Sequence, residues 1–111
     1  LKLVLPVASK LLDEAGKLVC LVKPQFEAGR EQVGKKGIVR DKNVHRQVIE
    51  NVAEYALQSG LQPQGLTFSP VTGAKGNIEY LMFLSKKTEE GQTLRPETIE
   101  QIVNASHEEL E

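Results

Sequence analysis

Apolar side chains recur every three or four residues in three segments of the chain, and they cluster in three shorter segments, of which Leu18–Val22 is a continuous run. The first pattern is typical of helices that bury one face, and the second is typical of strands. We therefore expect helices at about residues 1–16, 43–59 and 96–109, and strands at Leu18–Val22, 65–71 and 77–85. Either Asp41 or Asn43 can cap the second helix.

The element order restricts the sheet topology. A strand, a helix and a further strand read as a right-handed βαβ unit with two parallel strands. The last two strands are joined by the short turn "TGAKG" and must form an antiparallel hairpin. The last strand carries apolar residues on both faces, so we expect it to be internal, between the other two. The fold class is α/β, and 111 residues make one domain at most.

This topology brings two charges to one rim of the sheet. Lys23 follows the five apolar residues Leu18–Val22, and Glu79 opens the last strand. On neighbouring strands they would be about 5 Å apart laterally, and with the last strand outside the gap would be about 10 Å. Ligands in open α/β sheets collect beyond strand ends. The alternative is a structural ion pair, or two unrelated charges on the rim.

Residues 24–41 lack a periodic pattern and are expected to form a long loop, which in a compact domain is usually functional or disordered. From Lys23 to Arg46 there are seven basic and three acidic residues, a net charge of +4, although the whole chain has a net charge of −1. This segment is the candidate contact surface for a polyanion, through Arg30, Lys35, Lys36, Arg40 and Lys42. The alternative is a solvated loop.

Composition excludes several other classes. The chain is 40% hydrophobic and 26% charged, which is ordinary for a globular protein. No segment approaches the ~20 apolar residues of a membrane span. The single cysteine, Cys20, lies within an apolar strand, and we expect it to be buried core in a reducing compartment. With two distant histidines, no metal site is expected.

The segments "LVKPQFEAGREQVGKKGIVRD", "HRQVIENV" and "GNIEYLMFL" closely resemble the TlyA family, whose members carry the name hemolysin and are similar to FtsJ-type ribose methyltransferases. The resemblance covers Leu1 to Leu84. It implies the carboxyl-terminal half of a Rossmann-like sheet that ends in an antiparallel hairpin. It also implies a cytoplasmic enzyme that uses S-adenosylmethionine to methylate a ribose 2′-hydroxyl of ribosomal RNA, with RNA or a ribosomal subunit as partner.

The family's catalytic set is Lys, Asp, Lys and Glu. Its second lysine matches Lys23 and its glutamate matches Glu79, whereas the first lysine and the aspartate have no counterpart in this sequence. The aspartate, the glycine-rich cofactor loop and an S4-like RNA-binding domain are expected upstream of Leu1. We therefore expect residues 1–111 to be the carboxyl-terminal portion of the methyltransferase domain, inactive alone.

A ribose hydroxyl is a poor nucleophile, so a base or a hydrogen-bonding group positioned on it assists transfer. We assign Lys23 as this base or orienting group and Glu79 as the residue that positions it. Two other functions stay open. A non-catalytic RNA- or ribosome-binding module needs the basic segment but not the pair. A membrane-lytic toxin requires an amphipathic or spanning apolar segment, which the sequence lacks.

Overall fold

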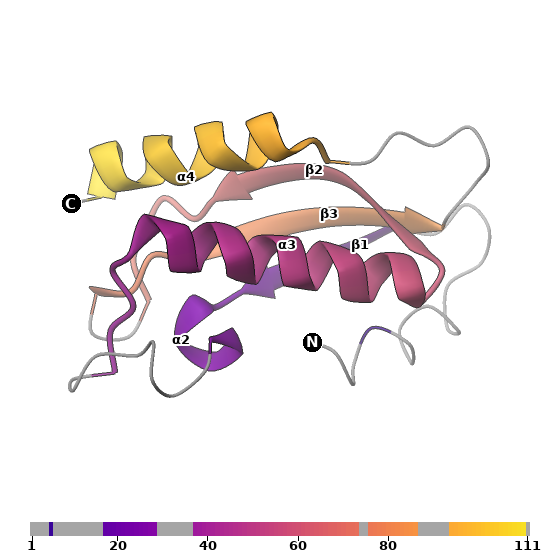
Figure 1. Ribbon diagram of the computed structural model, residues 1–111, viewed down its shortest axis with the longest axis horizontal. Coiled ribbons are helices and arrows are strands. Elements are labelled where there is room, and N and C mark those ends of the chain that lie inside the picture. Colours follow the sequence, from indigo (N-terminus) through magenta and orange to yellow (C-terminus); the bar gives the residue numbers. More distant parts are fainter. Residues whose placement is uncertain (1–4, 6–16, 29–36, 74–75, 87–93, 111) are drawn as a thin grey trace.

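The computed structural model describes residues 5, 17–28, 37–73, 76–86 and 94–110 (Figure 1). Apart from Leu5, which is helical and buried, the predicted helix at residues 1–16 lies outside the described residues.

Three strands form one sheet, β1 (Lys17–Val22), β2 (Leu61–Phe68) and β3 (Tyr80–Lys86). Their order is β1-β3-β2, and β3 is antiparallel to both neighbours, so β1 and β2 are parallel to each other. The predicted hairpin and the internal position of the last strand are both confirmed. The carboxyl ends of β1 and β2 and the start of β3 therefore lie at the same end of the molecule (Figure 1).

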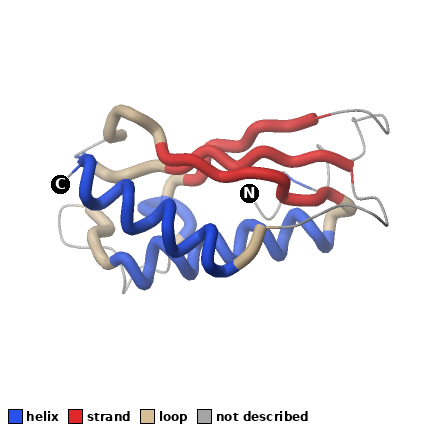
Figure 2. Tube along the Cα trace, turned by 90° about the horizontal axis from the view of Figure 1, so that it is seen from above, coloured by secondary structure: helices blue, strands red, loops and turns tan. Residues whose placement is uncertain are grey.

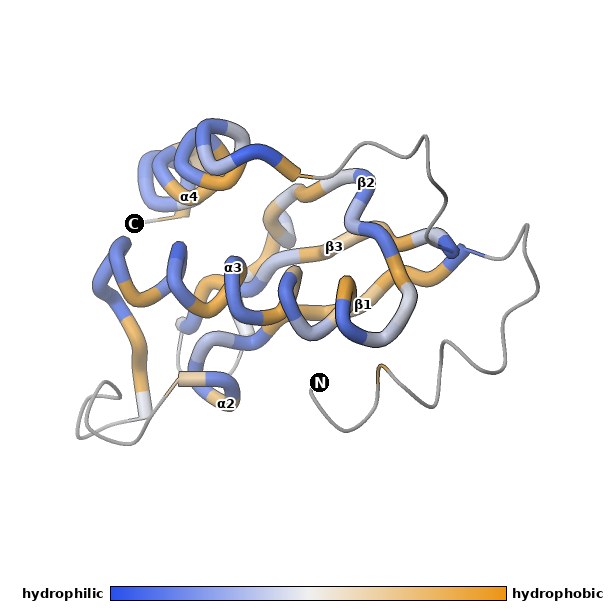
Figure 3. The backbone as a smooth tube through the Cα atoms, turned by 45° about the vertical axis from the view of Figure 1, so that its right-hand side comes forward, coloured by the Kyte–Doolittle hydropathy of each residue, from blue (hydrophilic) through white to orange (hydrophobic). Residues whose placement is uncertain are grey.

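Helices α3 (Lys42–Gln58) and α4 (Pro96–Leu110) cover one face of this sheet (Figure 2). The residues that the two helices bury are mostly hydrophobic, among them Val48, Ile49, Val52, Ile99 and Val103. Figure 3 shows such hydrophobic segments, in orange, recurring along both helices. Asp41 is the cap of α3, because its carboxylate accepts a hydrogen bond from the Asn43 backbone N–H at 2.8 Å. After α3, Gly60 adopts a φ of 80°, a conformation that glycine reaches without strain.

Three elements differ from the prediction. β3 begins at Tyr80 and not at residue 77, so Glu79 lies one residue before the strand. β2 begins at Leu61, four residues before the predicted start, and accommodates Pro63 through a register shift between Pro63 and Gly65. A proline is tolerated there because β2 is an outer strand of the described sheet. The predicted loop after Lys23 instead begins with a single helical turn, α2 (Pro24–Glu27). Pro24 suits its first position, and the Ala28 N–H closes the turn on the Pro24 carbonyl at 2.9 Å.

On the opposite face of the sheet, several apolar side chains of β1 and β3 are exposed. Val19 is 54% exposed, and Leu21 and Phe83 are each 41% exposed. These residues alternate with buried ones, because the described helices pack on one side only. Cys20 points to the covered side and is buried as predicted, and desolvation raises the pKa of its thiol to about 11. The thiol is therefore protonated and unreactive at neutral pH.

A buried polar network holds the helices and β3 together. The Ser106 hydroxyl donates to the Val103 carbonyl at 2.7 Å, so it accepts from the Tyr80 hydroxyl at 2.8 Å. The same Tyr80 hydroxyl lies 3.0 Å from Nδ1 of His45, which is also 2.9 Å from Nε2 of His107. All four polar side chains are buried, and a buried polar group is costly unless it is hydrogen-bonded. The network therefore favours one packing of α3 and α4 on the sheet.

We expect Tyr80→Phe to lower the free energy of unfolding by about 1–3 kcal/mol, because the ring still fills its site while the buried Ser106 hydroxyl loses its donor. Denaturant unfolding measures this loss, and Ser106→Ala completes a double-mutant cycle. The double variant should lose less than the sum of the single losses. Strict additivity would mean that the two hydroxyls do not act as a unit.

Candidate active site at the rim of the sheet

Lys23 and Glu79 meet where β1 ends and β3 begins. Val22 is paired with Tyr80 in antiparallel strands. The residue after Val22, which is Lys23, therefore lies opposite the residue before Tyr80, which is Glu79. Nζ of Lys23 lies 3.8 Å from Oε2 of Glu79. The structure thus brings together the two residues that the sequence singled out, and their catalytic roles stay predictions.

The Glu79 carboxylate is buried and tightly surrounded. The residue is 7% exposed, and Oε2 accepts a hydrogen bond from Nε2 of Gln25 at 2.8 Å. Its carbonyl accepts from the Ser69 N–H at 2.9 Å, which continues the β2–β3 ladder beyond β3. A Cβ atom at Gly73 would overlap the carboxylate. The acid is therefore held by its backbone, by an amide donor and by the close approach of a glycine.

Lys23 is less constrained than its partner. It is the residue before α2, and its side chain is 40% exposed compared with 9% for Glu79. Its Nζ also lies 5.7 Å from the centre of the Phe26 ring. The ammonium group is thus near both a buried carboxylate and an exposed aromatic ring, and it has access to solvent.

Asn77 fixes the neighbouring chain segment to the same rim. It is 1% exposed, its Oδ1 accepts from the Val39 N–H at 2.9 Å, and its Nδ2 donates to the Gly37 carbonyl at 2.9 Å. The Val39 carbonyl in turn accepts from Nε2 of His45 at 2.8 Å. The residues that lead into α3 are therefore anchored close to the start of β3.

Sequence reasoning missed Gln25, Gly73 and Asn77 as site residues. Their partners lie 54, 6 and 38 positions away, and no periodic pattern encodes such contacts. The sequence offered one signal, and only for Asn77, which is a polar residue at the start of a predicted apolar strand.

The basic segment is described in part. Arg40 and Lys42 are exposed at the amino-terminal end of α3, which lies at the same end of the molecule as α2 and the start of β3 (Figure 1). Arg30, Lys35 and Lys36 lie outside the described residues. In the part of the chain that the structure describes, no helix is long and apolar enough to span a membrane. No group of three or more potential metal ligands occurs in these same ranges.

Residues 5–86 match the family model of the FtsJ-like methyltransferases. The chain belongs to this family. A Bacillus subtilis (strain 168) protein named "Putative rRNA methyltransferase YqxC" is 48% identical to this FtsJ-like chain over 112 residues, which cover 99% of the chain and 40% of that protein. The Mycobacterium tuberculosis protein "16S/23S rRNA (cytidine-2'-O)-methyltransferase TlyA" is 37% identical over 86 residues, 78% of the chain and 32% of that protein. The resemblance to the TlyA family is thereby confirmed.

A solved structure shares the fold. A "Putative hemolysin" from Streptococcus thermophilus superposes with a TM-score of 0.89 at 46% identity, over 97% of this chain and 38% of that one. The chain thus spans about two-fifths of the length of this structure and of the B. subtilis relative. The mixed α/β sheet with its antiparallel strands is accordingly an FtsJ-like methyltransferase fold.

Gly73→Ala tests the close approach to Glu79. The added methyl group must displace either the carboxylate or the turn, at a cost of about 1–3 kcal/mol for overpacking. We expect the variant to have a lower free energy of unfolding. Gly65→Ala is the matched control, because its Cβ would meet the Phe83 ring at 3.4 Å, an ordinary contact distance. Equal effects of the two substitutions would contradict a specific constraint at Gly73.

Proposed function

We propose that this chain is the carboxyl-terminal portion of the methyltransferase domain of an S-adenosylmethionine-dependent ribosomal RNA 2′-O-ribose methyltransferase. In this proposal residues 1–111 supply one end of a larger Rossmann-like sheet, and the cofactor loop and an S4-like domain lie upstream. The pair formed by Lys23 and Glu79 is the observation that carries the proposal. Its substrate, ribosomal RNA, would place the protein in the cytoplasm.

The open side of the sheet supports a larger domain. Val19, Leu21 and Phe83 expose apolar surface on one face, and the outer edge of β1 has no strand partner among the described residues. A long apolar edge strand is prone to pair with other chains unless it is covered. Further strands and helices of the same domain would pair with this edge and cover this face.

The rim suits a ribose hydroxyl. Nζ of Lys23 can lie within about 3 Å of the 2′-oxygen, where it orients the hydroxyl or, as the neutral amine, accepts its proton. Glu79 holds the ammonium group toward the rim at 3.8 Å. Positioning the attacking oxygen is the larger part of such catalysis, because holding the two reactants in the reacting geometry removes much of the entropic cost of bringing them together.

S-adenosylmethionine, when bound, supplies the methyl group on a sulfonium centre. The described residues suit the ribose hydroxyl that accepts the methyl group, and not the sulfonium centre of the cofactor. The positive charge of Lys23 disfavours a second cation in direct contact with it. The residues that hold the cofactor are expected upstream of Leu1.

The basic segment would bind the RNA backbone. Arg40 and Lys42 are exposed near the rim, and we propose that they act with Arg30, Lys35 and Lys36 on phosphates. Phosphate contacts position a nucleic acid and carry no sequence information directly. A non-catalytic RNA-binding module would use the same residues, so the function of the pair decides between the two.

Substitution of the pair tests the catalytic proposal in the intact protein. We expect Lys23→Ala to reduce methyl transfer from labelled S-adenosylmethionine to ribosomal subunits by about 100-fold or more, which is the usual contribution of a positioned acid or base. Glu79→Gln should cause a smaller loss, mainly in kcat, since the amide keeps the shape but not the charge. RNA binding should change little in both variants.

Lys17→Ala is the control, because Lys17 is exposed at the opposite end of β1, roughly 20 Å of strand away. Near-normal methyl transfer by Lys23→Ala would remove the proposal. It would leave the RNA-binding module as the better account.

The salt dependence of RNA binding tests the basic segment. Each phosphate contact contributes to the slope of log K against log salt concentration, so replacing Lys35 and Lys36 with glutamine should flatten this slope by about one to two units. Lys17→Gln should leave it unchanged. An unaltered slope in the double variant would count against phosphate contacts in this segment.

A further inference from the structure

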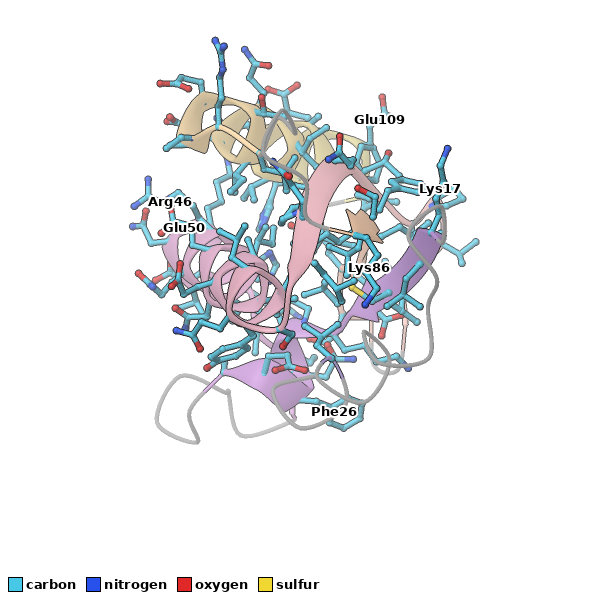
Figure 4. All side chains as sticks on the ribbon, turned by 90° about the vertical axis from the view of Figure 1, so that its right-hand side faces the viewer. Lys17, Phe26, Arg46, Glu50, Lys86 and Glu109 are labelled. Carbon is cyan, nitrogen blue, oxygen red and sulfur yellow. The ribbon has the colours of Figure 1, made fainter. Side chains whose placement is uncertain are left out.

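Phe26 is exposed without a folding reason among the described residues. It is 74% exposed, the highest value of any large hydrophobic side chain in the described ranges, and it is not part of the hydrophobic core. In Figure 4 it lies beyond the ribbon of α2 and points away from α3 and α4. The other residues of this turn are used differently, since Pro24 is buried and Gln25 donates to Glu79. Folding of this turn therefore explains the proline and the glutamine, and not the phenyl ring.

The ring lies directly beside the candidate active site. Its centre is 5.7 Å from Nζ of Lys23, and the same Nζ is 3.8 Å from Oε2 of Glu79. Because the ammonium lies near both groups, a molecule that contacts the ammonium can also contact the ring. An exposed cation–π contact contributes only about 0.5–1 kcal/mol and does not require the ring face to stay open.

A nucleobase fits the ring better than an apolar protein surface does. Phe26 lies between the polar residues Gln25 and Glu27 in the sequence, and the ammonium group of Lys23 is near its ring, so its exposed face has polar neighbours. Single-stranded RNA is typically bound by stacking of unpaired bases on such aromatic faces, while the polar base edges stay hydrogen-bonded or solvated. An apolar partner would require a contiguous hydrophobic patch.

We propose that Phe26 stacks against the base of the nucleotide whose 2′-hydroxyl is held at Lys23, an inference that rests on the proposed function. A hydroxyl hydrogen-bonded to Nζ lies about 3 Å from it. Its own base is attached through the two adjoining ribose carbons, and can therefore come within contact distance of a ring 5.7 Å from Nζ. Stacking fixes the ribose as well as the base, so Phe26 is a positioning residue for the acceptor.

The test compares Phe26→Leu with Phe26→Tyr in the intact protein, with ribosomal subunits as substrate. Loss of one stacked base should lower kcat/KM for methyl transfer about tenfold or more in Phe26→Leu. Phe26→Tyr keeps the aromatic face and should stay within about twofold of the parent, since its face can stack equally well. Val71→Ala is the control for removal of exposed apolar surface, because Val71 is 69% exposed but carries no ring. It should leave kcat/KM unchanged.

Three results would overturn the inference. Phe26→Leu with normal kcat/KM would show that no base stacks there. Equal losses in the leucine and tyrosine variants would show that the aromatic face is not the property used. A lower free energy of unfolding for Phe26→Leu would show that another part of the protein covers the ring. Each of these is distinct from failure of the proposed function, which is judged by the activity of Lys23→Ala.

Discussion

The insertion of β3 between β1 and β2 determines what can meet at the rim. Antiparallel hydrogen bonds on both sides of β3 fix its register, so Glu79 must lie one position beyond the Val22–Tyr80 pair. A slip of one residue would turn each β3 side chain to the other face, because strand side chains alternate. The carboxylate would then leave Lys23, and Tyr80 would leave the covered core. The position of the acid is thus a property of the whole sheet.

Three nearby residues connect this register to the rest of the molecule. Tyr80 donates to Ser106 of α4 and contacts His45 of α3, Asn77 holds the backbone before α3, and Glu79 accepts from α2. Each bond is buried or part-buried, so losing one leaves a polar group without a partner at a cost of about 1–3 kcal/mol. A shifted register would break all three connections together. The polar contacts therefore contribute specificity to a core whose apolar residues alone would tolerate several packings.

Elements that depend on a repeating pattern could be predicted from the sequence. Single contacts between residues far apart in the chain could not. Helical and strand periods predicted α3, α4 and the internal β3, and the cap by Asp41 follows from local chemistry. The turn α2 was missed because a four-residue helix has no period. The exposure of Val19 was not predictable, because an apolar run indicates that a strand can be covered, and not which part of the protein covers it.

The separation of Lys23 from Glu79 is itself informative. At 3.8 Å the pair is longer than the 2.7–2.9 Å of a charge-assisted hydrogen bond, and the close donor to Oε2 is instead Gln25. Gln25 thereby satisfies the buried acid, and Lys23 experiences its charge without being bonded tightly to it. A lysine in a short ion pair would have to break that bond to reach a substrate. Here the ammonium stays directed toward the rim and free to hydrogen-bond a hydroxyl, which a purely structural ion pair would not require.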